Sequence, residues 1–347
     1  MDLRIGIIGS GSWATALTKI LTDNNRPVNW WIRNSDTIDI IRKQHHNPFY
    51  LNIVNFDTAL LSISADMEKV IQDSDLLIVA IPSAFVEESF AGLSKDIFRN
   101  KKIVSAIKGL LPGKNILLNY YLLQEFGVPL ENYFAIMGPC HAEEVATEKL
   151  SYLTFSGNDI TTAADIASYF KTGYINTIIN HDILGVQYAA VLKNIYALGA
   201  GIAHGLDYGD NFLSVYIANS ADEMACFLQK FGVEHIVVGE HDGEDPLTHR
   251  KTPNYAASVY LGDLLVTCYS LYSRNRTFGK MIGKGYAVKD AQRELNMVAE
   301  GYNASKCIYN INQSVMAEIP IADTVYHILW ENVKPIEGFK RLEQVLI

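Results

Sequence analysis

Short apolar runs alternate with amphipathic helical patterns from Met1 to about Asn180. Apolar runs rich in β-branched residues are typical of buried parallel strands, and their alternation with helices indicates right-handed βαβ crossovers. The segments predicted as strands are Arg4–Ile8, Val28–Ile32, Leu76–Ile81, Lys102–Ile107, Tyr133–Met137, Tyr152–Ser156 and Thr177–Asn180. We therefore expect residues 1–180 to form an α/β domain around a doubly wound, mostly parallel sheet.

The pattern changes after His181, where Leu, Ile, Ala and Tyr recur at helical intervals and clear strand alternation is absent. This spacing predicts an all-helical domain over residues 181–347. The segments that carry it most clearly are Gly185–Ile202, Phe212–Phe231, Tyr255–Ser273 and Asn303–Trp330. The stretch Glu234–Pro253 interrupts them with acids and with His235, His241 and His249. These histidines lack the i, i+4 spacing of a helical metal site, so we interpret the stretch as a solvated insertion.

The first predicted strand runs directly into Gly9-Ser10-Gly11-Ser12-Trp13-Ala14, and a helical pattern follows. Gly9 and Gly11 permit a tight turn and the close backbone approach that a pyrophosphate needs, while the first amides of the helix attract an anion. Ala14 stands where a small side chain lets helix and strand pack closely. The pattern is typical of Rossmann-like dinucleotide-binding domains, although similar turns occur in proteins that bind no dinucleotide.

Composition narrows the range of partners. The net charge of −9 and the lack of a long basic run argue against a nucleic-acid-binding surface and favour small-molecule ligands. We recognise no secretory signal pattern and no apolar stretch long enough to span a bilayer. Cys140, Cys226, Cys268 and Cys307 lie far apart, without metal-binding or disulfide spacing. We expect a cytoplasmic protein without a metal centre.

Polar residues follow the predicted strands of the first domain, and ligands of open α/β sheets gather at these carboxyl ends. Arg33 follows the second strand, where NAD-preferring domains usually carry an acid. It either binds a 2′-phosphate or adenine, or is simply an exposed loop residue. Lys108 follows a later strand and is placed to reach cofactor or substrate, unless it is only solvated. Arg33 favours NADPH and leaves NADH open.

Lys193 and Asn194 interrupt an otherwise apolar helical pattern. A buried ammonium or amide is costly without a partner, and a lysine beside a ketone can donate a proton during hydride transfer. The alternative is a lysine at the surface. Asp263 is a candidate to orient Lys193. Ser273-Arg274-Asn275 offers a hydroxyl, a guanidinium and an amide in succession, which suits a phosphate monoester.

These segments, in this order, resemble the NAD(P)-dependent glycerol-3-phosphate dehydrogenase family, most closely its bacterial biosynthetic branch. An ordered set that extends from near residue 4 to about Trp330 is more specific than any one segment. The matching segments are Gly9-Ser10-Gly11-Ser12-Trp13-Ala14-Thr15-Ala16-Leu17, Ile81-Pro82-Ser83, Lys108-Gly109, Gly138-Pro139 with Ala142 and Glu144, Leu192-Lys193-Asn194, Gly209-Asp210-Asn211, Gly262-Asp263-Leu264, Ser273-Arg274-Asn275-Arg276, Phe278-Gly279 and Val298-Ala299-Glu300-Gly301.

The resemblance implies reversible reduction of dihydroxyacetone phosphate to sn-glycerol 3-phosphate with NAD(P)H, feeding glycerophospholipid biosynthesis. It implies a helical domain like the C-terminal domain of 6-phosphogluconate dehydrogenase, with Lys193 as catalytic acid and base; helical domains of this kind often pair, so we expect a homodimer. The substrate-binding residues are Lys108, Gly138, Cys140, Lys193, Asn194, Asp263, Thr267, Ser273, Arg274 and Asn275. The cofactor-binding residues are Gly9, Gly11, Ser12, Trp13, Arg33, Lys108, Ala142, Arg274, Val298 and Glu300.

The chain departs from the family pattern in two places. Cys140 stands where a small hydroxyl residue is usual, and His141 where an aromatic residue is usual. The segment between Met224 and Gly262 is also longer than in the typical bacterial form, which maps the extra length onto Glu234–Pro253.

Two other functions remain open from the residues alone. A reductase of another oxo acid or of an imine does not need Ser273-Arg274-Asn275. A nucleotide-sensing protein without turnover leaves Lys193 and Asp263 unexplained.

Overall fold

The computed structural model describes residues 3–234, 236, 238, 256–295 and 299–347. They form two compact units, Met1–Ile107 with Leu117–Ile183 and Lys108–Ile116 with Leu184–Ile347. Lys108–Ile116 thus belongs to the second unit, although the segments on both sides of it belong to the first. The two units are therefore not separated by a single boundary in the chain. The expected insertion, with His235, His241 and His249, lies almost entirely outside the described residues.

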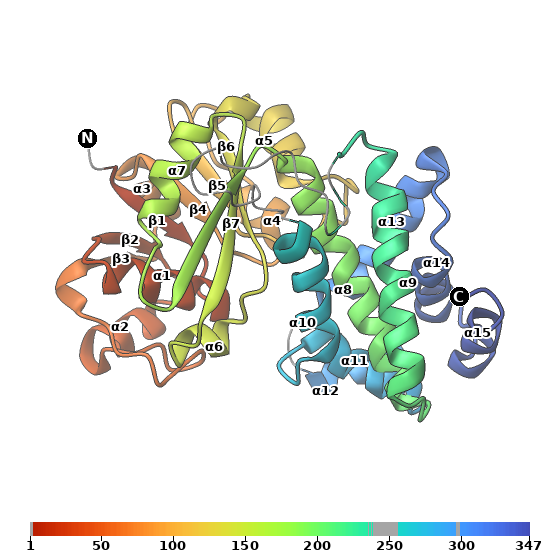
Figure 1. Ribbon diagram of the computed structural model, residues 1–347. Helices are drawn as coiled ribbons and strands as arrows, with labels where there is room; N and C mark the ends of the chain where they lie inside the picture. The colour runs from red at the N-terminus through yellow and green to blue at the C-terminus, as the bar shows by residue number, and fades with distance from the viewer. Residues whose placement is uncertain (1–2, 235, 237, 239–255, 296–298) are drawn as a thin grey trace, which may run out of the picture. The chain divides into compact units, whose positions relative to one another are not determined.

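The first unit is built around an eight-stranded sheet with the order β3-β2-β1-β4-β5-β6-β7-β8 (Figure 1). Neighbouring strands are parallel, except that β7 runs antiparallel to β6. The predicted Rossmann-like, mostly parallel sheet is therefore confirmed. The strands are β1 Ile5–Ile8, β2 Val28–Trp31, β3 Leu61–Ser64, β4 Leu76–Val79, β5 Lys102–Ser105, β6 Tyr133–Met137, β7 Ser151–Gly157 and β8 Ile175–Asn180.

The sequence analysis missed one strand, β3. It pairs only with β2, at the edge of the sheet, and Ile63 is its one buried residue. An edge strand needs no continuous apolar run, because neither face is fully covered. The sequence Leu61-Ser62-Ile63-Ser64 therefore lacks the signal that revealed the central strands.

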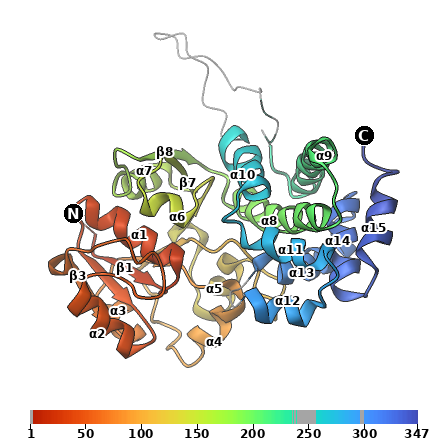
Figure 2. The ribbon, with the colours of Figure 1, turned by 90° about the horizontal axis from the view of Figure 1, so that it is seen from below.

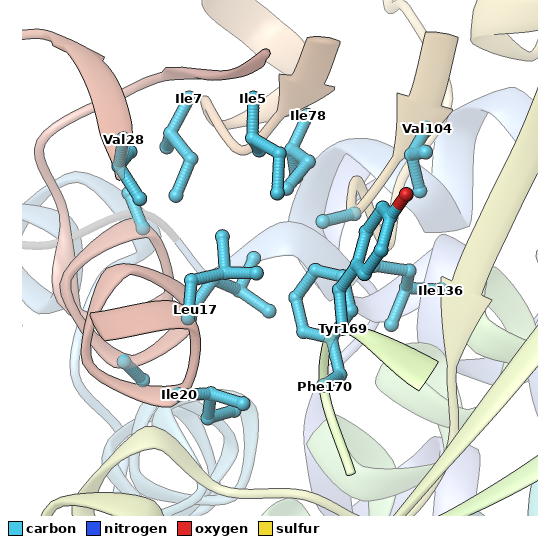
Figure 3. Packing of buried hydrophobic residues seen from close by; sticks show 14 of the residues in the cluster. Ile5, Ile7, Leu17, Ile20, Val28, Ile78, Val104, Ile136, Tyr169 and Phe170 are labelled. Atoms are coloured by element: carbon cyan, nitrogen blue, oxygen red, sulfur yellow. The ribbon is translucent and has the colours of Figure 1, made fainter. Parts of the chain in front are cut away.

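Helix α1 (Ser12–Asp23) covers the middle of the sheet, where its buried face packs on the central strands. Figure 3 shows Leu17 and Ile20 directed towards Ile5, Ile7 and Val28. The other helices of this unit are α2 Ser35–Gln44, α3 Met67–Gln72, α4 Val86–Phe90, α5 Leu118–Phe126, α6 Ala142–Ala146 and α7 Ile160–Ser168, with short 3₁₀ segments η1 Thr58–Leu60, η2 Ser83–Phe85 and η3 Leu130–Asn132.

The second unit is helical, as predicted (Figure 2). Its segments are α8 Ile183–Gly205, α9 Asp210–Gln229, the π-helical η4 Ala256–Gly262, α10 Asp263–Tyr269, α11 Arg274–Gly283, α12 Val288–Leu295, α13 Glu300–Val315, α14 Pro320–Trp330 and α15 Pro335–Leu342. The helical pattern over Asn303–Trp330 corresponds to two helices, because Met316 has a left-handed φ of 54° and Pro320 begins a new helix.

Helix α8 corrects the expectation that no apolar stretch is long enough to span a bilayer. It has 23 residues, and its most apolar 18-residue window has a mean hydropathy of 1.2, so by length and composition it is able to cross a bilayer. It is the one such helix among the described residues, and 94% of its apolar window is buried within the structure. This burial is what a core helix of a folded domain requires, because such a helix is hydrophobic on all sides.

Helices α8 and α11 are in backbone contact. A Cβ atom added at Gly279 would lie 1.9 Å from the carbonyl oxygen of Leu198, and one at Gly201 would lie 2.1 Å from that of Arg276. Backbone atoms cannot turn aside as a side chain can, so both positions require glycine. The contact fixes α11 against the helix that carries Lys193.

Glu223 of α9 is buried, with 5% of the residue exposed, and its carboxyl group lies at the start of α14. It accepts hydrogen bonds from the backbone N–H groups of Ile321 and Ala322. These bonds lower its pKa, but burial outweighs them and raises the pKa to about 8. Glu223 is therefore protonated at neutral pH in the folded protein.

We predict that Glu223→Gln makes stability less dependent on pH. The folded-state pKa of Glu223 lies above its unfolded value, so its contribution to stability is full below the unfolded pKa and is lost as pH rises towards about 8. Each unit of the pKa increase corresponds to about 1.4 kcal/mol. Urea unfolding at pH 5.5 and 9 should show the variant gaining relative to the parent at high pH, with exposed Glu337→Gln as control. A parallel decline in both proteins would contradict this.

Candidate active site

The turn between β1 and α1 is shaped by its glycines. Gly9 has a φ of +136°, and a Cβ atom there would lie 2.4 Å from the carbonyl oxygen of Ala80. Gly11 precedes α1, no side chain caps this helix, and a Cβ at Gly11 would meet nothing within 4 Å. The space beside Gly11, directly before the start of α1 at Ser12 and Trp13, is thus open. This is the arrangement that a pyrophosphate requires.

Two residues that the sequence analysis did not identify hold this turn. The indole N–H of Trp30 donates to the carbonyl oxygen of Gly9 at 2.6 Å. The side-chain amide of Asn47 donates to the carbonyl oxygen of Ser10 at 3.1 Å and to the hydroxyl of Thr15 at 2.9 Å, and Asn47 is completely buried. Asn47 lies in a loop without a recognisable motif, so no local signal pointed to it.

Other predicted residues follow parallel strands of the same sheet. Arg33 lies just beyond β2 and is exposed, while Asn34 caps α2 with its side chain. Gly138 follows β6 with a φ of +114°, and a Cβ there would lie 2.8 Å from the carbonyl oxygen of Tyr152. Cys140 and Ala142 are buried in the turn into α6. The first unit thus brings Gly9, Gly11, Arg33 and Gly138 to the carboxyl ends of β1, β2 and β6.

In the second unit, Lys193 of α8 and Asp263 of α10 form a buried ion pair. The Lys193 Nζ donates to the Asp263 Oδ1, and the two side chains are 5% and 2% exposed. Burial lowers the pKa of Lys193 to about 8, while the charge of Asp263 raises it and that of Lys108 lowers it. Asp263 begins α10 directly after the π-helical turn η4, and such turns often lie at functional sites.

Lys108 is the second cation beside Asp263. Its Nζ lies 3.8 Å from the Asp263 Oδ2, an oxygen with no hydrogen-bond partner in the described chain. The Lys108 side chain is 20% exposed, more than that of Lys193. Two ammonium groups therefore share one carboxylate, which leaves an excess of positive charge at this place.

A chain of amide hydrogen bonds connects the Lys108 segment with α8, α11 and α13 around this pair. The Asn194 Nδ2 donates to the carbonyl oxygen of Lys108 at 2.8 Å, and the Asn275 Nδ2 donates to the Asn194 Oδ1 at 2.8 Å. The Asn275 Oδ1 accepts from the backbone N–H of Gly301 at 2.9 Å. The chain joins α8, the start of α11 and the start of α13, which carries Glu300. Val298 lies outside the described residues.

The remaining predicted residues lie on α10 and α11. The Thr267 hydroxyl donates to the carbonyl oxygen of Asp263 at 2.6 Å. The Ser273 side chain caps α11 by accepting from the Arg276 N–H at 3.3 Å. Arg274 is the first residue of α11 and is exposed, with no hydrogen bond or ion pair to any described residue. Its guanidinium is thus available to an anion.

Comparison with known proteins identifies the family. The two profiles of NAD-dependent glycerol-3-phosphate dehydrogenase match residues 4–163 with its N-terminal part and residues 182–340 with its C-terminal part. The chain belongs to the NAD-dependent glycerol-3-phosphate dehydrogenase family. A family member from Bacillus pumilus, glycerol-3-phosphate dehydrogenase (NAD(P)+), is 33% identical over 98% of this chain and 93% of its own. The corresponding protein of Lacticaseibacillus paracasei is 31% identical over 96% and 92%.

Solved structures of the family share the fold over the whole chain. Glycerol-3-phosphate dehydrogenase from Coxiella burnetii has a TM-score of 0.86 at 26% identity and covers 98% of both chains. The Plasmodium falciparum enzyme has a TM-score of 0.79 at 25% identity and covers 98% of this chain and 94% of its own. The two solved structures therefore match both units of this chain.

We predict that Asp263→Asn lowers the pKa of Lys193 further. The carboxylate charge favours the ammonium form, and its removal leaves burial and the charge of Lys108 unopposed. Acylation of Lys193 by an amine-reactive anhydride, followed by mass spectrometry across pH, reports the fraction of neutral amine. Its midpoint should shift to lower pH, and Asp290→Asn on exposed α12 should leave it in place. An unchanged midpoint would show that Asp263 does not set this charge.

Proposed function

We propose that the protein reduces dihydroxyacetone phosphate reversibly to sn-glycerol 3-phosphate with NAD(P)H, and so supplies the backbone of glycerophospholipids. The observation that carries the proposal is the buried ion pair of Lys193 and Asp263, in a chain that belongs to the glycerol-3-phosphate dehydrogenase family. A proton donor and a hydride donor are what a ketone reduction requires.

The first unit suits the cofactor. The open space at Gly11 and the uncapped start of α1 fit a pyrophosphate, which the backbone amides would bind. NAD(P)H, when bound, supplies the hydride. Arg33 is exposed beyond β2 and would pair with a 2′-phosphate, which supports NADPH as the preferred form.

The second unit suits the substrate. With a pKa of about 8, Lys193 holds a proton at neutral pH and releases it readily to a developing alkoxide. Asp263 orients the Lys193 ammonium, and Lys108 adds positive charge that favours an oxyanion. We assign substrate binding also to Asn194, Thr267, Ser273 and Asn275 of this unit, and to Gly138 and Cys140 of the first unit.

Arg274 would hold the substrate phosphate. Its guanidinium has no partner among the described residues and stands beside the buried Asn275. A fork of N–H donors matches the oxygens of a phosphate monoester. The fixed phosphate places the carbonyl carbon in one orientation, which raises the chance of productive hydride transfer.

We also propose a cytoplasmic location and a homodimer. Cys140, Cys226, Cys268 and Cys307 form no disulfide, which a reducing compartment favours.

The test is steady-state oxidation of NADPH and NADH by the purified protein, with dihydroxyacetone phosphate, with unphosphorylated dihydroxyacetone and without a ketone. We expect turnover that depends on the phosphorylated ketone and is faster with NADPH. Equal use of both ketones would favour a different reductase. Binding of NADPH without turnover would favour a nucleotide sensor.

Two substitutions should separate the roles in the site. Lys193→Ala should lower kcat about 100-fold or more, because it removes the proton donor. Arg274→Ala should lower kcat/KM for dihydroxyacetone phosphate about 10- to 100-fold, because it removes charged hydrogen bonds to the phosphate. It should leave the unphosphorylated ketone unaffected, and exposed Arg293→Ala serves as its control. Near-parental turnover by Lys193→Ala would refute the acid–base assignment.

A further inference from the structure

The segment around α11 is basic in an acidic protein. Residues 264–289 contain Arg274, Arg276, Lys280, Lys284 and Lys289 and no aspartate or glutamate, whereas the whole chain has a net charge of −9. Asp263 and Asp290 bound this segment, and Asp263 is already paired with Lys193. Positive charge is therefore concentrated on α11 and the residues that directly follow it.

The structure gathers this charge on one side of α11. Arg276 and Lys280 of α11 and its C-cap residue Lys284 follow one another at intervals of four residues, so they lie on one side of the helix. Burial lowers the pKa of His204 on α8, and the charges of Lys280, Arg276 and Lys284 lower it further, while only Asp207 raises it. We call Arg276, Lys280 and Lys284 the basic face of α11.

The basic face has little acid to neutralise it. Lys280 and Lys284 form no ion pair with any described residue, and Arg276 donates from Nη1 to the carbonyl oxygen of Tyr269 at 2.7 Å. Of the neighbouring acids, Asp290 on α12 lies 3.7 Å from the Arg293 guanidinium. Lys284 is exposed, and Arg276 and Lys280 are half-buried, so part of the charge of the basic face is available to solvent and to anions.

The basic face begins two residues after Arg274, the first residue of α11. Lys284 caps the C-terminal end of α11, ten residues after Arg274, which at the rise of an α-helix corresponds to about 15 Å. Charges act over such distances when the salt concentration is low, because the Debye length is about 30 Å at 0.01 M and about 8 Å at 0.15 M.

We propose that the basic face of α11 attracts phosphate monoester dianions and guides them to Arg274. The inference rests on the proposed function and adds the path by which the substrate arrives. A chain with a net charge of −9 repels a dianion at long range. A local cluster of cations reverses this repulsion near the site and raises the rate of productive encounter.

The test uses the full chain with Lys280→Gln and Lys284→Gln combined. Two unit charges acting on a dianion across about 12 Å of water give about a fivefold effect at 10 mM ionic strength and less than about twofold at 150 mM. We therefore expect kcat/KM for dihydroxyacetone phosphate to fall about fivefold at low salt and to approach the parental value at high salt. We expect kcat, and all values for unphosphorylated dihydroxyacetone, to remain unchanged.

Two controls define the mechanism. Lys280→Arg with Lys284→Arg keeps the charges and should behave as the parent. Lys95→Gln with Lys171→Gln removes two exposed cations from the first unit and should change little. The inference is overturned if the loss is the same at every ionic strength, if it extends to the uncharged ketone, or if the control pair reproduces it.

A failure of the proposed function gives a different result. The parental protein would then not turn over dihydroxyacetone phosphate under any condition. Calorimetric titration with the same compound at two ionic strengths still measures the attraction, and the glutamine pair should weaken binding about fivefold at low salt. Equal affinity of the parent and the glutamine pair at low salt, or no binding at all, would overturn the inference.

Discussion

The burial of Lys193 against Asp263 is the constraint on which the rest of the second unit depends. Removing two charges from water is expensive, and their attraction offsets this only when the geometry is good and further contacts complete it. Lys108 beside the second carboxylate oxygen completes the arrangement electrostatically. Two ammonium groups and one carboxylate leave one positive charge in excess. A site of this kind favours the appearance of an oxyanion, as a ketone reduction requires.

Good geometry at this pair requires that α8, α10 and α11 cannot shift against one another. The backbone contact at Gly279 and Gly201 supplies this for α8 and α11, because no side chain lies between them that can adjust. The amide chain through Asn194 and Asn275 extends the same rigidity to the start of α13. Asn194 and Asn275, which the sequence analysis assigned to substrate binding, thus hydrogen-bond to each other and to the backbone. These bonds hold α8, α11 and α13 in place.

What the sequence predicted, and what it did not, follows from the range of the interactions. The turn from β1 through Gly9 and Gly11 into α1 is predictable because its signal lies within a few neighbouring residues. The contact of Asp263 with Lys193 joins residues far apart in the chain, and the clues to it were the polar pair Lys193 and Asn194 in an apolar helix and the resemblance to the family. Asn47 supports the glycine turn from a loop with no pattern.

Strand β3 was missed for a related reason, since burial on one side of an edge strand leaves no apolar run. The assignment of Lys108–Ile116 to the second unit has no local signal at all, because the segment directly follows a strand of the first unit. Hydrophobic periodicity indicates which side of a segment is buried. The position of β3 and the unit to which Lys108–Ile116 belongs depend instead on which distant segment packs against it.

Under the proposed function, the two units would recognise anions in different ways. The first uses backbone amides at the start of α1, which are uncharged and lose little when no ligand is bound. The second would use ammonium and guanidinium groups, which attract at longer range; Arg274 and the basic face of α11 lie apart from carboxylates in the sequence. In a chain with a net charge of −9, this separation requires a stretch of sequence without acids, and residues 264–289 are such a stretch. The distribution of charge along the chain therefore indicates where this protein attracts anions, which its net charge does not.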